Sequence, residues 1–133
     1  MTSFESWIVG NVSWLLPLFL LVVNIAFKVL VDHKATLPDL FQALIHLPVE
    51  MKFLALGFFG GFALAPQGDV NLGFIFVLFF LFTSMFTVTF AKRATTAFQS
   101  ADYKTCITLF ALNFCFSFLA LSYSVSKLQG MAQ

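Results

Sequence analysis

Charged residues are scarce in this sequence, and their scarcity limits what the protein can be. Only 13 of the 133 residues are charged, or 10%, whereas soluble domains typically carry about 25%. Hydrophobic residues make up 60% of the chain, and the formal net charge is +1. The cations form no cluster larger than the pair Lys92 and Arg93. The composition therefore argues against a water-soluble globule, and no nucleic acid partner is expected.

Residues that do chemistry are equally few. Cys106 and Cys115 lie nine residues apart, a spacing that indicates neither a disulfide framework nor a metal-ligand pair. His33 and His46 are the only histidines, and they complete no recognisable ligand set. No nucleophile and base pair, glycine-rich phosphate loop or cofactor motif can be read. The sequence predicts no catalytic, metal or cofactor site, and we expect the protein not to be an enzyme.

Long uncharged runs are what the sequence does contain. They cover residues 6–27, 53–68, 70–91 and 105–126, with lengths of 22, 16, 22 and 22. A bilayer core of about 30 Å needs roughly 20 apolar residues in a helix. The sequence therefore predicts an all-α integral membrane protein, folded as a single four-helix transmembrane domain. The expected spans are about 8–31, 49–66, 70–92 and 104–126.

The cations predict how these spans are oriented. Lys and Arg beside membrane spans favour the cytoplasmic side. Six of the seven cations flank the first and third connections: Lys28, Lys34, Lys52, Lys92, Arg93 and Lys104. The seventh, Lys127, lies beyond the last span. Both termini are therefore expected outside, in a multi-pass protein of the cell inner membrane. The short second run could instead be a re-entrant segment, but the third connection would then place its cations outside.

The first connection is long enough to hold a short helix. Thr36 and Asp39 have the spacing of a helix start, and Pro48 is expected to end the helix. One side is apolar, with Leu40, Phe41, Leu44 and Leu47. This pattern predicts an amphipathic helix over about 37–47 at the cytoplasmic surface of the bilayer. It would either cover the end of the bundle or act as a docking or gating element.

Small residues mark one face of the second span. Gly57, Gly61 and Ala65 follow one another at intervals of four, the pattern that lets membrane helices approach closely. We expect a neighbouring helix to pack on this face. The neighbour can belong to the same chain or to another copy.

Polar residues inside the spans form a second pattern: Asn24, Thr83, Thr87, Asn113 and Ser117. They would either line a polar path through an oligomer or join helices by hydrogen bonds. No Asp or Glu is expected deep in a span, which disfavours a proton-coupled transporter. Glu50, near the inner end of the second span, is expected to pair with Lys28 or Lys52.

These features favour a small non-enzymatic membrane protein that self-assembles into an oligomer and forms a channel or perturbs the membrane. One alternative is an accessory, assembly or immunity-type subunit that binds another membrane protein. A further alternative is a small-solute transporter without proton coupling. The lipid bilayer is the expected surrounding in each case.

Overall fold

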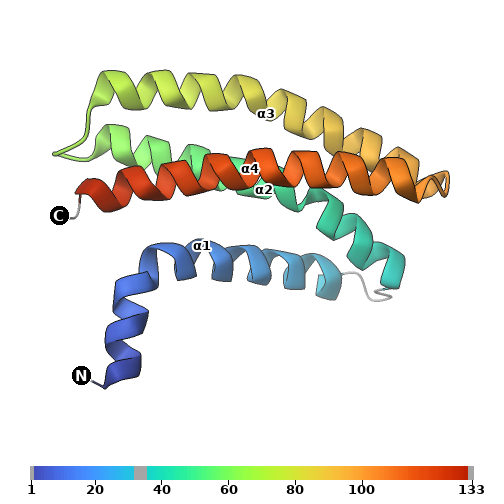
Figure 1. Cartoon of the computed structure of the whole chain (residues 1–133), viewed down its shortest axis with the longest axis horizontal. Coiled ribbons are helices and arrows are strands. Elements are labelled where there is room, and N and C mark those ends of the chain that lie inside the picture. Colours follow the sequence, from blue (N-terminus) through green and yellow to red (C-terminus); the bar gives the residue numbers. More distant parts are fainter. Residues whose placement is uncertain (1, 32–35, 132–133) are drawn as a thin grey trace.

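The computed structural model describes residues 2–31 and 36–131, which form four helices (Figure 1). The helices are α1 (Ser3–Val31), α2 (Leu37–Leu64), α3 (Val70–Gln99) and α4 (Tyr103–Met131). Each contains a segment that is long and apolar enough to cross a membrane. The predicted all-helical fold with four such helices is thus confirmed.

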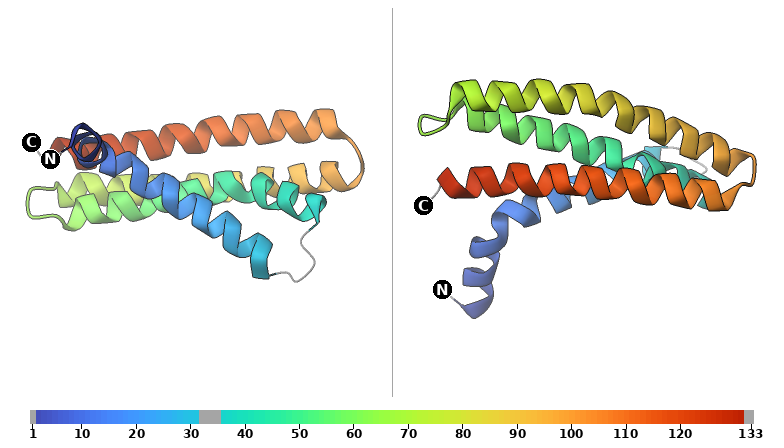
Figure 2. Two further views of the ribbon diagram at one scale, coloured as in Figure 1. Left: turned by 90° about the horizontal axis from the view of Figure 1, so that it is seen from below. Right: turned by 45° about the horizontal axis from the view of Figure 1, so that its top comes forward.

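Three of the four helices form a bundle, and the fourth lies against it. Helices α2, α3 and α4 run side by side in alternating directions, while α1 lies along one side (Figures 1 and 2). The connections are short, with residues 65–69 between α2 and α3 and residues 100–102 between α3 and α4. The start of α1 and the end of α4 lie towards one end of the bundle, and α2 begins at the other (Figure 1).

Close packing joins α2 to α3. A Cβ atom placed on Gly73 would lie 2.5 Å from the Cβ of Ala63, so only glycine fits at this contact. Phe59 is fully buried, and its ring stacks on those of Phe76 and Phe80, with centroids 5.0 Å apart in both pairs. Further along α3, three buried alanines face the interior: Ala91, Ala94 and Ala97. Small residues and stacked rings let these two helices approach closely over most of their length.

Helix α2 is continuous, and the expected separate helix over about 37–47 is wrong. Those residues form the first part of α2, and Pro48 lies inside the helix. A proline removes one backbone hydrogen bond and kinks a helix, but it does not oblige the helix to end. Ile45 before Pro48 and Met51 after it are both buried in the bundle. Packing on both sides of the proline explains why the helix continues through it.

The continuity of α2 also changes the position of Glu50. From the sequence this carboxylate is expected at the inner end of a span. It lies instead near the midpoint of α2, 13 residues after Leu37 and 14 before Leu64. A charged group therefore does lie midway along one of the apolar helices.

Helix α1 is bent, and its first part points away from the bundle (Figure 1). Pro17 lies inside α1 and is fully buried. Because proline has no amide N–H and its ring crowds the preceding turn, a sharp bend near it is expected. The candidate membrane span within α1 is correspondingly shorter than the helix, covering Trp14–Val31.

Candidate functional site

A polar anchor attaches α1 to the bundle. Glu50 on α2 forms an ion pair with Lys28 on α1, as expected for one of its two candidate partners. Its other carboxylate oxygen accepts a hydrogen bond from Asn24 Nδ2 at 2.8 Å. Asn24 is exposed, so this residue of the expected polar set joins two helices at the rim of their contact. Both oxygens of Glu50 are thus bound by α1.

The small-residue face of α2 lies on the same side as this anchor. Gly57 and Gly61 follow Glu50 by seven and eleven residues, which are close to two and three helical turns. Both glycines are exposed, and a Cβ atom on either would meet nothing within 4 Å. Ala65, directly after the helix, is partly exposed. Within the described parts of the chain, no helix closes on this face.

The bend in α1 explains why the face is open. Helices α1 and α2 run in opposite directions, so α1 residues before Asn24 would meet α2 residues after Glu50. The contact does continue for a short distance, since Trp14 and Leu21 of α1 pack with the α2 and α4 core residues. The part of α1 that precedes this contact points away from the bundle (Figure 1). Helix α2 is therefore covered by α1 at Glu50 and uncovered at Gly57 and Gly61.

The polar residues of α3 and α4 face one another within one chain. Thr87, Asn113 and Ser117 are buried, and Thr83 is half-buried. Asn113 Nδ2 on α4 donates a hydrogen bond to the backbone oxygen of Thr87 on α3, at 3.0 Å. The Thr83 and Thr87 hydroxyls donate to carbonyls of their own helix. This arrangement joins the two helices and places these side chains towards the interior of the bundle.

Lys52 is the polar residue of the interior that sequence reasoning missed. A lysine at this position is expected at the membrane surface, yet its side chain is 4% exposed and lies between helices. The Nζ atom lies 4.9 Å from the centroid of the Phe80 ring. Spacing could have revealed it, because Lys52 falls on the buried stripe of α2 that includes Ile45, Pro48, Ala55 and Phe59. A charged residue on an otherwise apolar helix face is the sequence signal that could have identified Lys52 as a buried residue.

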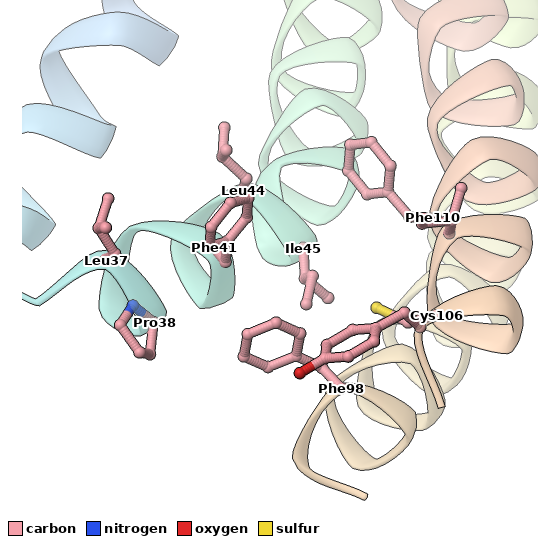
Figure 3. Close-up of a pocket in the computed structure, with 10 residues that line it drawn as sticks. Leu37, Pro38, Phe41, Leu44, Ile45, Phe98, Cys106 and Phe110 are labelled. Atoms are coloured by element: carbon pink, nitrogen blue, oxygen red, sulfur yellow. The ribbon is translucent and has the colours of Figure 1, made fainter. Parts of the chain in front are cut away.

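An apolar groove opens at the end of the bundle where α2 begins (Figure 3). Its volume is about 540 Å³, within the range of small-molecule pockets. Of the residues expected on the apolar side of the interfacial helix, Phe41 and Leu44 line this groove, with the Phe41 ring 6.1 Å from that of Phe98. Leu40 is half-buried, and Leu47 packs against the bundle core. The lining carries no charged side chain, and its polar side-chain groups are the Tyr103 hydroxyl and the Cys106 thiol.

Metal-ligating side chains do not gather in the residues that the structure describes, where no three His, Cys, Asp or Glu could hold an ion together. His33 lies outside the described residues. The fold and its contacts define a helical bundle with four potential membrane spans and an uncovered helix face. The chain matches no family model, no curated protein and no solved structure.

Proposed function

We propose that this protein is a non-enzymatic multi-pass membrane protein that self-assembles, and that two copies meet through the Gly57 and Gly61 face of α2. The observation that carries the proposal is the exposure of both glycines, which lie two and three turns along the face that α1 covers at Glu50. An interface between helices already exists on this side of α2, at Glu50. The uncovered part continues that interface.

The chemistry of lipid-embedded helices supports this assignment. Lipid tails are as apolar as leucine side chains, so helix association depends on close backbone approach and on van der Waals contact. Glycines four residues apart provide the shallow surface that such contacts need. Two copies of α2 can bring the same face together across a two-fold axis, which is the commonest symmetry of homo-oligomers.

The test is the mass of the detergent-solubilised protein, measured by light scattering, for the wild type and the Gly57→Leu and Gly61→Leu variants. The wild type is expected as a dimer or higher oligomer and both variants as monomers. A leucine at either position meets no atom of its own chain near the Cβ. The variants should therefore fold normally, with unchanged helical circular dichroism.

The control is Ala111→Leu, which adds similar bulk to an exposed position in the first half of α4. This variant is expected to retain the wild-type mass. A wild-type chain that is strictly monomeric in several mild detergents and in nanodiscs would refute self-assembly. Wild-type mass in both glycine variants would refute this face as the contact.

The same face could instead bind a different membrane protein, which is the accessory or immunity-type alternative. The exposed glycines favour it equally, since a small-residue face accepts any helix of matching shape. A monomeric wild type that co-purifies stoichiometrically with one membrane protein, and loses it on Gly57→Leu, would select this alternative. Retention of the partner by Ala111→Leu is the matching control.

Channel formation draws less support from the geometry than self-assembly does. Thr87, Asn113 and Ser117 are buried within one chain and take part in its interior, so they are not free to line a path between copies. We expect liposomes containing the protein to show no ion flux above that of empty liposomes. A protein-dependent current that is abolished by Asn113→Leu would show that the protein forms a pore. The transporter alternative has no further observation in its favour.

We further propose that the protein lies in the cell inner membrane with both termini outside the cytoplasm. Lys28, Lys92, Arg93 and Lys104 belong to helix segments near the end of the bundle where α2 begins, and Lys127 lies near the other end. The end rich in cations is the one expected in the cytoplasm. Cysteine labelling in intact cells tests this, because Ser126→Cys should react with an impermeant reagent and Ser100→Cys should not.

A further inference from the structure

The apolar groove at the end of the bundle where α2 begins runs along two helices. On α2 its lining residues lie between Leu37 and Ile45, and on α4 between Tyr103 and Phe110. Helices α2 and α4 begin at this same end and run in the same direction (Figure 1). The two lined stretches therefore extend inward together for about 10 to 12 Å. In a bilayer that these helices cross, the groove lies parallel to the lipid acyl chains.

The length of the helices sets the depth of the groove. Helix α4 has 29 residues and is about 44 Å long, whereas the hydrocarbon core of a bilayer is about 30 Å thick. With the excess divided between the two ends, Tyr103 lies at the level of the lipid headgroups, where tyrosine is enriched. Phe110, seven residues further along, lies about 10 Å deeper and reaches the hydrocarbon. The groove thus extends from the headgroups to the upper part of the acyl chains.

The lining has the polarity of a lipid at this depth. The rings of Phe41, Phe98 and Tyr103 follow one another, with centroids 6.1 and 6.0 Å apart, and Ile45 and Cys106 are buried beneath them. The one hydroxyl of the lining, on Tyr103, is at the headgroup level, and the deeper lining is apolar. An apolar space of about 540 Å³ that stays empty loses van der Waals contacts. Hydrocarbon chains are the medium that can fill it.

The charges near the groove favour an anionic headgroup. Lys92, Arg93 and Lys104 are exposed, and in the part of the chain that the structure describes none of them forms an ion pair. The carboxylates of this end, Asp39 and Asp102, accept hydrogen bonds from backbone N–H groups at the starts of α2 and α4. Cations beside a membrane span attract anionic lipids. Lys104 directly follows the tyrosine of the lining.

We propose that the groove binds an anionic glycerophospholipid, with the upper part of one acyl chain between α2 and α4. The Tyr103 hydroxyl donates a hydrogen bond to an ester or phosphate oxygen of the lipid, and the Lys104 ammonium attracts the phosphate. The groove lies in the first third of α2, whereas Gly57 and Gly61 lie in its last third. The lipid site is therefore independent of the proposed self-assembly, and either can fail without the other.

Photolabelling of the full-length chain in phosphatidylcholine vesicles tests the position of the lipid. The probe is a phosphatidylglycerol with a diazirine in the upper half of one acyl chain, and mass spectrometry of peptides locates the label. We expect the label to concentrate on residues 37–45 and 103–110. An excess of unlabelled phosphatidylglycerol should suppress it, and additional phosphatidylcholine should not.

Filling the groove should remove the label. Leu44 is a half-buried residue of the lining, and Leu44→Trp adds bulk on the open side of the groove. This variant should lose most of the groove label while keeping the helical circular dichroism and the oligomeric mass of the wild type. The matched control is Leu119→Trp, at an exposed position of α4 outside the groove, which should leave the labelling unchanged.

Two milder variants test the headgroup contacts, with lipid affinity measured by native mass spectrometry. Tyr103→Phe should weaken phosphatidylglycerol binding about five-fold through loss of one hydrogen bond. Lys104→Gln should weaken it by a similar factor and leave phosphatidylcholine binding unchanged, and Lys127→Gln, near the other end of the bundle, is the control. Label spread evenly around the bundle, or groove label that survives in Leu44→Trp, would overturn the proposed site. Equal affinity for the two lipids would overturn the anionic headgroup.

Discussion

Helix α2 meets α3 and α1 in two different ways. Against α3 it is packed closely along its length, with Gly73 against Ala63 near one end and three buried alanines of α3 towards the other. Against α1 it is held by the polar anchor at Glu50 and by the packing of Leu21 and Trp14 on the bundle core, and the first part of α1 then points away. The first contact depends on the close fit of small residues and rings, whereas the second combines a shorter apolar contact with an ion pair. The difference indicates a rigid three-helix bundle with a fourth helix that is more easily displaced.

The close contact is expected to be the more sensitive of the two. Gly73→Ala places a Cβ 2.5 Å from that of Ala63, and overpacking of this kind costs about 1–3 kcal/mol. Unfolding in mixed detergent with increasing denaturant measures the loss. Ala63→Gly combined with Gly73→Ala exchanges the two small residues and should recover most of it. An undiminished stability of Gly73→Ala alone would contradict the packing described for α2 and α3.

Loss of the polar anchor should release α1 while leaving the bundle intact. Glu50→Leu removes the partner of both Lys28 and Asn24, and bonds between membrane helices contribute roughly 0.6–1.7 kcal/mol each. Spin labels on α1 and α2 should show a broadened distance distribution, whereas labels on α2 and α3 should keep theirs. Glu5→Leu, at the far end of α1, is the matched control. A broadened α2–α3 distance would show that the two contacts are not independent.

Straightening α1 should change how much of the exposed α2 face it covers. Pro17→Ala restores a backbone hydrogen bond and favours a straight helix, since proline in a helix interior costs about 3 kcal/mol relative to alanine. The first part of α1 is then expected to lie along α2 and cover Gly57 and Gly61. The same light-scattering measurement should show a larger monomer fraction than in the wild type. If α1 is straightened and the oligomer is unchanged, the bend in α1 is not the reason why the Gly57 and Gly61 face is exposed.

The smallest expected effect concerns the turn between α3 and α4. The Thr105 hydroxyl and backbone N–H lower the pKa of Asp102 below its ordinary value, and this carboxylate caps the start of α4. A lowered folded-state pKa means that the carboxylate stabilises the fold above its unfolded pKa of about 3.8 and that this contribution is lost as pH falls through the folded value. Asp102→Asn should therefore reduce the acid sensitivity of amide protection in the first turn of α4. Identical pH profiles would show that the cap contributes nothing.

Local signals in the sequence were sufficient for the four long apolar helices and for some of their ends. The uncharged runs locate the four helices, and Thr36 and Asp39 mark the start of α2, where Asp39 accepts hydrogen bonds from the Thr36 backbone N–H and hydroxyl at 2.8 and 2.6 Å. The end of α2 at Leu64 lies within two residues of the expected end of the second span, at about 66. Each of these features depends on neighbouring residues, which a single sequence displays.

Features that depend on tertiary packing were not predicted. Pro48 ends a helix or only kinks it according to what the segments on either side pack against, and here both pack against the same bundle. Gly57 and Gly61 have the four-residue spacing that predicts a helix contact and Gly73 does not, yet of these three glycines it is Gly73 that meets another helix. Lys52 was assigned to the surface because lysine usually lies there. Its place on a stripe with Ile45 and Phe59 shows that helical spacing can outweigh residue type.

The central claim is that the open face of α2 joins two copies in the membrane, and disulfide cross-linking tests it most directly. Gly61→Cys is placed in a Cys115→Ser background, since Cys115 is exposed and Cys106 is buried, and membranes are oxidised without detergent. The account predicts a cross-linked dimer through Cys at position 61 and none when the cysteine is placed at Ala111 instead. Equal cross-linking at both positions, or none at position 61, would contradict it.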